Sequence, residues 1–287
     1  MTTSLEALLT RAEAVLARVE TLLPPARPVP DWQAQAFRWQ GTGLQSLPMP
    51  ATMALSQLTG VEAQKAKLVR NTRQFVAGRS ANNVLLTGAR GTGKSSLIKA
   101  LLPEFAADGL RLIEVDKSHL RDLPAIIECI IDRPERFIVF CDDLSFEEGE
   151  DSYKALKSIL DGTLLRRCDH VLIYATSNRR HLMPERMRDN LETRNDDGEI
   201  HPGDTIEEKI SLSERFGLWL SFYPFSQDNY LAAVHIWLDH FGLPHDALTE
   251  RAALLWALTR GARSGRVAYQ FACDWAGRLP EERQLDA

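Results

Sequence analysis

Residues 83–99 read NVLLTGARGTGKSSLIK, and this stretch predicts the centre of the fold. The apolar run at 84–87 is typical of a short buried strand, and the apolar residues after Lys94 have helical spacing. Between them lies the pattern G-x-x-x-x-G-K-[ST], from Gly88 to Ser95. In the context of strand, glycine-rich turn and helix, this pattern forms a loop that binds phosphate. The stretch therefore predicts that the chain binds a nucleotide.

The loop positions suit this task chemically. Glycines let the backbone N–H groups fold around a phosphate, and the N-terminus of the following helix adds partial positive charge. Lys94 is expected to reach the β- and γ-phosphates, and the Ser95 hydroxyl to ligate Mg²⁺. The candidate nucleotide-binding residues of the loop are Gly88, Gly91, Thr92, Gly93, Lys94, Ser95 and Ser96.

The composition is that of an ordinary globular protein. The 287 residues are 44% hydrophobic and 25% charged, and the net charge of −5 gives no global attraction to nucleic acid or to an anionic membrane. There is no apolar run of about 18 residues and no signal-peptide pattern, so we expect a cytoplasmic protein without membrane contact. The four cysteines are widely separated, which argues against a structural zinc site and predicts buried, reduced thiols.

The N-terminal fifty residues differ from the rest. An apolar stripe at helical spacing predicts a helix over 4–23, and the proline-rich segment 24–30 predicts an extended linker. Trp32, Phe37 and Trp39 follow in a glutamine-rich stretch. Two interpretations remain open here. The aromatic residues dock onto the main domain, or they form a partner or self-association surface together with the helix.

The remainder alternates short apolar strands with helices of about a dozen residues, which predicts an α/β fold with a parallel sheet covered on both faces. The expected sheet has five strands, at 84–87, 110–115, 137–141, 171–176 and 218–222. After Pro224 the pattern becomes helical, at 227–241, 246–260 and 264–278. We therefore expect an N-terminal helical extension at 1–50, a nucleotide-binding α/β domain at 51–225 and a small helical lid at 226–287.

Polar residues follow two of these strands. The strand FIVFC ends at Asp142 and Asp143, where Asp142 is expected to serve Mg²⁺ and Asp143 to polarise an attacking water. Asn178 follows the next strand and is a candidate for positioning that water or sensing the γ-phosphate. The alternatives are a turn or a helix cap, which also favour Asp, Ser and Asn.

Arginines supply the remaining candidates. Arg215 in SERFG and Arg266 in GARSGR are candidates for stabilising charge on a transferred phosphate, with Arg263 as a competitor of Arg266. An isolated arginine is more often a solvated surface residue. The basic stretch 179–188 is either a solvated face or a nucleic-acid contact.

The order of these motifs resembles an AAA+ ATPase. DDLSFE at 142–147, TSNRRHL at 176–182 and EEKISLSERFGLWLSFYPF at 207–225 are similar to a bacterial family of predicted AAA+ ATPases without an assigned cellular role, near the replication-initiator and helicase-loader group. The resemblance covers about residues 50–275.

The resemblance implies a role for each candidate residue. It implies ATP with Mg²⁺, Asp142 and Asp143 as the Walker B pair, and Asn178 as the first sensor. Arg215 becomes an arginine finger acting on ATP in the neighbouring subunit, and Arg266 a second sensor in the lid. Gly60 and Val61 lie in the segment that borders the adenine, which completes the implied set.

Three functions compete. The first is an ATPase that hydrolyses ATP between subunits of a homo-oligomeric ring or open helix and remodels or loads a macromolecular partner. The second is a nucleotide-gated binding module, such as a DNA-associated scaffold or loader with little turnover. It is favoured by the basic stretch and by Asp143, where many AAA+ enzymes have the longer Glu. The third, a small-molecule kinase, shares the phosphate loop but explains neither Arg215 nor the helical tail.

Overall fold

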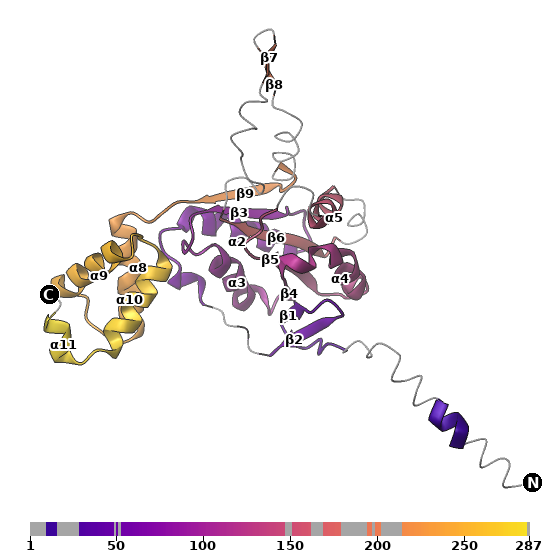
Figure 1. Ribbon diagram of the computed structural model, residues 1–287, viewed down its shortest axis with the longest axis horizontal. Coiled ribbons are helices and arrows are strands. Elements are labelled where there is room, and N and C mark those ends of the chain that lie inside the picture. Colours follow the sequence, from indigo (N-terminus) through magenta and orange to yellow (C-terminus); the bar gives the residue numbers. More distant parts are fainter. Residues whose placement is uncertain are drawn as a thin grey trace, which may run out of the picture.

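The computed structural model describes two packed units, an α/β body and a helical lid (Figure 1). The described residues are 10–15, 29–48, 50, 53–146, 151–161, 169–178, 194–196, 199–201 and 214–285. The lid lies at one end of the body (Figure 1). The short hairpin of β7 (Arg194–Asp196) and β8 (Glu199–His201) stands away from the body (Figure 1). The predicted α/β class with a helical lid is confirmed.

The body is built on a seven-stranded sheet in the order β2-β1-β4-β5-β6-β3-β9. All five strands predicted from the sequence are present and parallel: β3 (Val84–Gly88), β4 (Leu110–Val115), β5 (Arg136–Cys141), β6 (Val171–Ser177) and β9 (Leu218–Phe222). Because the strands are parallel, the carboxyl ends of β3, β5 and β6 meet at one edge of the sheet. This is the edge where the candidate site residues follow.

The sheet has seven strands where the sequence predicts five. The two additional strands are β1 (Ala36–Trp39), which pairs parallel to β4, and β2 (Leu44–Leu47), which pairs antiparallel to β1. Each has only four residues, too few for an alternating pattern to stand out from the sequence. The sheet therefore begins before residue 50, the boundary expected between the N-terminal extension and the α/β domain.

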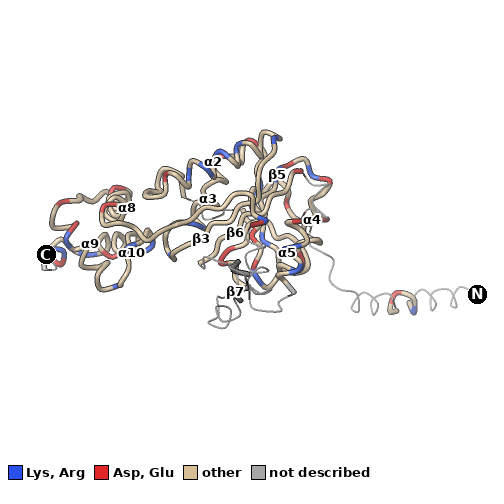
Figure 2. Tube along the Cα trace, turned by 90° about the horizontal axis from the view of Figure 1, so that it is seen from above, with Lys and Arg blue, Asp and Glu red and all other residues tan. Residues whose placement is uncertain are grey.

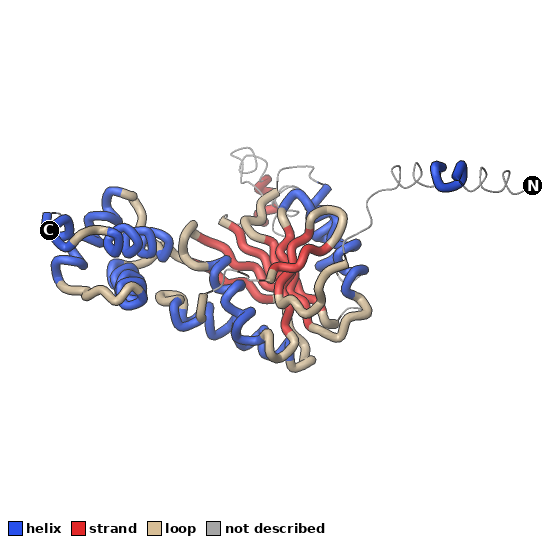
Figure 3. Tube along the Cα trace, turned by 90° about the horizontal axis from the view of Figure 1, so that it is seen from below, coloured by secondary structure: helices blue, strands red, loops and turns tan. Residues whose placement is uncertain are grey.

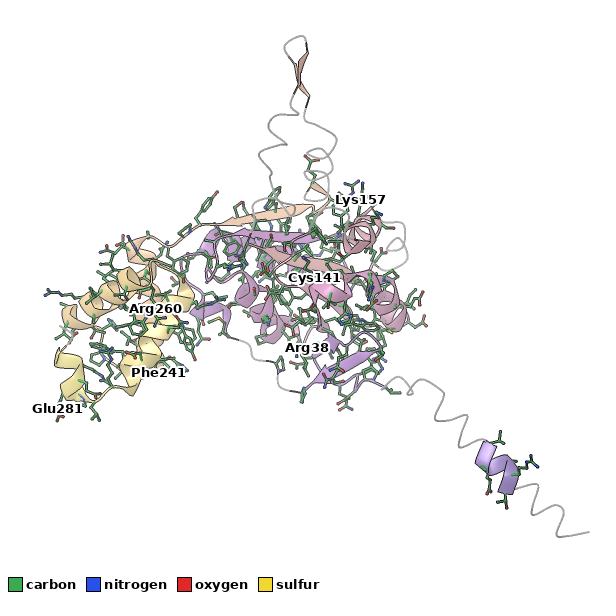
Figure 4. The ribbon with its side chains drawn as sticks, viewed as in Figure 1. Arg38, Cys141, Lys157, Phe241, Arg260 and Glu281 are labelled. Atoms are coloured by element: carbon green, nitrogen blue, oxygen red, sulfur yellow. The ribbon has the colours of Figure 1, made fainter. Side chains whose placement is uncertain are left out.

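The aromatic segment is part of the core of the body. Phe37, Trp39 and Leu44 are at most 4% exposed. On the opposite face of β1, Arg38 forms an ion pair with Glu114 of β4 at 2.6 Å, and Figure 4 labels Arg38 at this end of the sheet. Burial of the apolar side chains favours the docking interpretation over an exposed partner surface for this segment.

Helices cover both faces of the sheet (Figure 3). One face packs against α2 (Glu62–Val76) and α3 (Lys94–Phe105), and the other against α4 (Leu123–Ile130) and α5 (Asp151–Leu160). Two short 3₁₀ helices, η1 (Leu55–Gln57) and η2 (Lys117–Asp122), precede α2 and α4. Each face has its own apolar core, because strands buried on both sides carry apolar residues throughout.

The lid consists of α8 (Gln227–His240), α9 (Ala247–Thr259), α10 (Gly265–Gly277) and α11 (Pro280–Leu285). The first three helices each begin with an N-cap side chain that accepts a backbone N–H: Ser226, Asp246 and Ser264. Tyr230 of α8 donates to the backbone oxygen of Ala253 in α9 at 3.0 Å, which fastens these helices together. The three helices predicted after Pro224 are thus present, and α11 is added.

Several predictions lie outside the described residues. Of the N-terminal helix predicted over 4–23, only 10–15 is described, and it is helical. The basic stretch 179–188 and Cys168 are likewise outside. Among the residues that are described, no helix is long and apolar enough to cross a membrane. Basic and acidic residues are intermingled along the described trace (Figure 2).

Candidate nucleotide site

The phosphate loop connects β3 to α3 with the geometry that its glycines require. A Cβ on Gly88 would lie 1.9 Å from the carbonyl oxygen of Phe222 in β9, so no side chain fits there. Gly93 is the N-cap of α3 with φ +92°, a left-handed conformation that glycine adopts readily. Thr92 is buried and its hydroxyl donates to the backbone oxygen of Ala89 at 2.8 Å. The loop is therefore shaped by its own sequence.

Lys94 lies inside this loop. Its ammonium donates to the backbone oxygens of Gly88 and Ala89, both at 2.8 Å, and to Oδ1 of Asn178 at 3.0 Å. Burial lowers the pKa of Lys94 below its usual value of 10.5, although the carboxylates of Asp142 and Asp143 act in the opposite direction. A poorly hydrated ammonium held by neutral oxygens is a strong partner for a phosphate.

Ser95 and Asp142 meet beside the loop. The Ser95 hydroxyl donates to Oδ1 of Asp142 at 2.5 Å, and the hydroxyl of Thr176 donates to the same oxygen at 2.6 Å. A hydroxyl and a carboxylate are oxygen donors of the kind that Mg²⁺ takes, and few such protein ligands suffice because Mg²⁺ keeps several waters. The donor set therefore fits the Mg²⁺ expected from the sequence.

Asn178 connects the lysine to the second carboxylate. Its amide nitrogen donates to Oδ1 of Asp143 at 2.6 Å while its amide oxygen accepts from Lys94. Asp143 has φ +51°, which makes it the one non-glycine residue in the described part of the chain with a positive φ. Strained backbone of this kind is maintained where the surroundings hold it in place.

Cys141, the residue before the two aspartates, is buried. Burial raises the pKa of the Cys141 thiol to about 12, and the charge of Asp142 adds to this effect. Cys141 is labelled within the body in Figure 4. It is therefore a neutral core residue, as predicted for buried cysteines, whereas Cys273 in the lid is exposed.

These groups face a cavity of about 670 Å³ between the body and the lid, within the usual range for small-molecule sites. Ten of the residues predicted from the sequence line it: Gly91, Thr92, Gly93, Lys94, Ser95, Ser96, Asp142, Asp143, Asn178 and Arg266. The lid closes directly on the phosphate loop, since the backbone N–H of Arg266 donates to the oxygen of Gly91 at 3.3 Å. Of the two competing arginines before and in α10, Arg266 lines the cavity and Arg263 does not.

Four predicted residues do not line the cavity. Gly88 lies beneath it against β9, and Val61 is buried in the core at 4% exposure. Gly60 follows the lining residue Thr59, and a Cβ there would come within 3.2 Å of the Asn229 side chain in α8. Its role is to let the segment before α2 approach the lid closely.

Arg215 is the fourth of these residues. It stands before β9, and its Nε donates to a carboxylate oxygen of Asp161 at the end of α5. Its side chain is 24% exposed. Arg215 is thus held at the surface of the body, away from the cavity of its own chain.

Other residues also line the cavity. Leu58 and Thr59 belong to the turn at 58–61 that the resemblance places beside the adenine. The lining residues that were not predicted are Met53 and Gln57 around η1, Arg90 in the loop, Thr176 in β6, Phe225 before α8, and Ala233, Trp237, Gly265 and Tyr269 in the lid. The rings of Trp237 and Tyr269 lie 4.7 Å apart in an edge-to-face arrangement and form an apolar end of the cavity.

A sequence signal existed for two of the missed residues. Tyr269 lies three residues after Arg266, on the same helix face, and Thr176 lies two residues before Asn178, on the same side of its strand. For Trp237 in α8 no local signal existed, because it reaches the cavity only through the packing of α8 on α10.

Residues 32–279 match a family described as "Protein of unknown function (DUF815)". The chain belongs to this family. The match begins at the aromatic segment, so the strands β1 and β2 belong to the family's common domain. None of the curated proteins compared matches the chain.

Solved structures resemble this chain over about four fifths of its length. The Holliday junction branch migration motor RuvB of Thermotoga maritima is 16% identical over 81% of this chain and 70% of its own, with a TM-score of 0.52. The Aeropyrum pernix ORC1 protein in complex with DNA is 16% identical over 80% of this chain and 65% of its own, with a TM-score of 0.51. At such identities the likeness concerns the fold alone, and it confirms the AAA+ fold expected from the motifs.

Proposed function

We propose that this DUF815 chain binds ATP with Mg²⁺ in the cavity between body and lid and hydrolyses it at sites completed by a second copy of the chain. The observation that carries the proposal is the convergence of Lys94, Ser95, Asp142, Asn178 and Arg266, from the loop, two strand ends and the lid, on one cavity. Phosphoryl transfer uses groups of these kinds: two cationic side chains at the phosphates, a hydroxyl and a carboxylate that hold Mg²⁺, and an amide near the attacking water.

In this proposal the residues divide the work. Lys94 and the loop N–H groups bind the phosphates, while Ser95 and Asp142 hold Mg²⁺, which supplies charge neutralisation at the phosphate oxygens. Asp143 accepts a hydrogen bond from the attacking water and orients it, and Asn178 holds that carboxylate in position from 2.6 Å. Arg266 approaches the phosphates from the lid. Trp237 and Tyr269 exclude water from the far end of the cavity.

Arg215 is the reason for proposing an assembly. Phosphoryl transfer gains greatly from an arginine on the developing charge, and AAA+ resemblance assigns that role to Arg215. Its side chain lies outside the cavity of its own chain and is paired to Asp161 at the surface. This location suits an arginine that serves the cavity of a neighbouring copy in a ring or open helix.

A matched pair of substitutions tests this role. Arg215 and Arg278 are 24% and 23% exposed, and each donates through Nε to an aspartate. We expect Arg215→Ala to keep its affinity for a fluorescent ATP analogue and to lose turnover by about 10³-fold, the lower end of what an arginine finger contributes. Arg278→Ala is expected to retain turnover. Turnover that is independent of protein concentration and unaffected by Arg215→Ala contradicts the assembly.

The second candidate is a nucleotide-gated binding module with little turnover. It is favoured by Asp143, whose short carboxylate is already engaged by Asn178 and is therefore less free to polarise water. A nucleic-acid partner is the form of this candidate suggested by the basic stretch 179–188. Titration of duplex DNA by fluorescence anisotropy at several salt concentrations, with and without ATP, decides this point. Absence of affinity in both states removes the nucleic-acid partner.

Whichever candidate holds, we propose that the partner acted on is a macromolecule. The expectation of remodelling or loading follows from the AAA+ resemblance and from the assembly inferred for Arg215. Affinity capture with Asp143→Asn, in the presence of ATP, is the direct experiment, because that substitution keeps the size of the side chain and removes its charge. Lys94→Ala is the control, because it is expected not to bind ATP. If both variants capture the same proteins, the partner does not depend on nucleotide.

A further inference from the structure

Thr176, the residue before the last of β6, makes three hydrogen bonds to one short turn. Its hydroxyl donates to Oδ1 of Asp142 at 2.6 Å and accepts from the backbone N–H of Asp143 at 3.0 Å. Its backbone oxygen accepts from the N–H of Leu144 at 2.6 Å. Three consecutive residues are thus held by one threonine, which is 2% exposed and lines the cavity.

The sheet explains why Thr176 reaches this turn. β5 and β6 are parallel, and their last paired residues are Cys141 and Ala175. Thr176 is therefore the next residue along β6, beside the point where the chain leaves β5 at Asp142. The pairing of β5 with β6 ends here, and the Thr176 hydroxyl supplies the turn with hydrogen bonds in its place.

The turn needs such support because the two carboxylates diverge within it. Asp142 points to Ser95, which is 2.5 Å away, whereas Asp143 points to Asn178 at 2.6 Å. Adjacent residues in an extended strand also diverge, but here the change occurs with φ +51° at Asp143. A left-handed aspartate is disfavoured, and its N–H donates to the Thr176 hydroxyl, so loss of this acceptor removes a bond that compensates the strain.

We propose that Thr176 is a positioning residue that directs Asp142 toward the metal side and Asp143 toward the water side of the site. This inference rests on the function proposed above. Thr176 acts through the two carboxylates and is not itself a ligand. Removal of partners that orient metal ligands in this way typically costs about ten- to a hundredfold in metal affinity or activity.

The test uses isosteric substitutions. Thr176→Val removes the hydroxyl and keeps the shape, and Thr176→Ser keeps the hydroxyl. Thr87→Val is the matched control: Thr87 is also 2% exposed, lies on the neighbouring strand β3, and its hydroxyl accepts from Nε1 of Trp219 at 2.7 Å without contacting a carboxylate. Thermal unfolding of all three variants measures the general cost of a lost buried hydrogen bond.

Two readouts separate positioning from stability. The first is binding of a fluorescent ATP analogue, titrated with Mg²⁺ or measured in EDTA. For Thr176→Val we expect about a tenfold rise in the Mg²⁺ concentration for half-maximal effect, with binding in EDTA unchanged. Thr176→Ser and Thr87→Val are expected to behave as the unmodified chain.

The second readout is the crystal structure of each variant. In Thr176→Val we expect Asp143 to leave the positive φ region and Asp142 to move from Ser95. Retention of both carboxylate directions in this crystal structure overturns the inference, as does an unchanged Mg²⁺ requirement. If the unmodified chain binds no nucleotide, the proposed function fails, and the crystal structures still decide whether Thr176 directs the carboxylates.

Discussion

The contact between the phosphate loop and the lid gives a prediction that can be worked out in detail. Gly91 has φ +75°, and a Cβ on it would lie 2.8 Å from the Ser264 hydroxyl and 3.3 Å from Cβ of Arg266. Gly91→Ala is therefore expected to force the lid from the loop. The comparison is Gly242→Ala, since Gly242 has φ +67° and no atom within 4 Å of its Cβ.

The expected magnitude follows from what each substitution disturbs. Both introduce an alanine into the left-handed region, at about 1 kcal/mol each. Gly91→Ala also displaces Ser264, the N-cap of α10, at about 1 kcal/mol, and weakens the bond from the N–H of Arg266 to the oxygen of residue 91 by a similar amount. The difference between the variants is then about 2 kcal/mol, or roughly thirtyfold in the equilibrium between a docked and a detached lid.

Hydrogen exchange measures this equilibrium directly. The backbone N–H of Arg266 is bonded to the oxygen of Gly91, so its exchange reports detachment of the lid. The backbone N–H of Val267 is bonded to the Ser264 hydroxyl within the lid, so its exchange reports loss of the cap. We expect the N–H of Arg266 to exchange roughly thirtyfold faster in Gly91→Ala than in Gly242→Ala, and the N–H of Val267 to exchange faster as well. Equal exchange in the two variants refutes the steric argument, because only the shared backbone strain would then remain.

Two further substitutions have defined outcomes. Burial acts to raise the pKa of Glu114, but the bonds of its carboxylate to Arg38 and Lys99 outweigh burial and leave the pKa below its usual 4.5. The charged carboxylate therefore stabilises the fold above pH 4.5, and this contribution is lost as the pH falls through the lower pKa of the folded state. Glu114→Gln should therefore lower the free energy of unfolding by about 1 kcal/mol at pH 7, and the difference should vanish in acid; a constant difference down to about pH 2 in urea titrations counts against it. Asp143→Asn should bind the fluorescent ATP analogue normally and lose turnover by about 100-fold. In size-exclusion chromatography with ATP it should elute as a stable assembly. Full turnover of this variant excludes Asp143 as the group that orients the attacking water.

The parts of the fold that the sequence reveals are those with local signals. The strand before the phosphate loop and FIVFC are continuous apolar runs, and the lid helices have caps and helical spacing, so both could be placed from sequence alone. β1 could not. It is four residues long, and its pairing with β4 depends on residues more than seventy positions away, including the ion pair of Arg38 with Glu114.

The site divides in the same way. Asp142 and Asn178 follow strands directly, and Lys94 follows the loop after β3, so parallel strand order brings all three to one edge of the sheet. Trp237 lines the cavity only because α8 packs on α10 and turns it inward, which is a tertiary effect without a local pattern. Arg215 was predicted as a site residue, and the cavity of its own chain does not include it. The function proposed above assigns this arginine to the cavity of a second copy.

The central claim is that one copy completes the site of another, and subunit mixing tests it most directly. Lys94→Ala is expected to lose ATP binding, and Arg215→Ala to bind ATP without turnover, so each variant alone is inactive. Mixed in equal amounts, they form some sites with an intact loop from one copy and an intact arginine from the other. Random mixing predicts recovery of about one quarter of the unmodified turnover. Mixed assemblies that form and show no recovery contradict the claim.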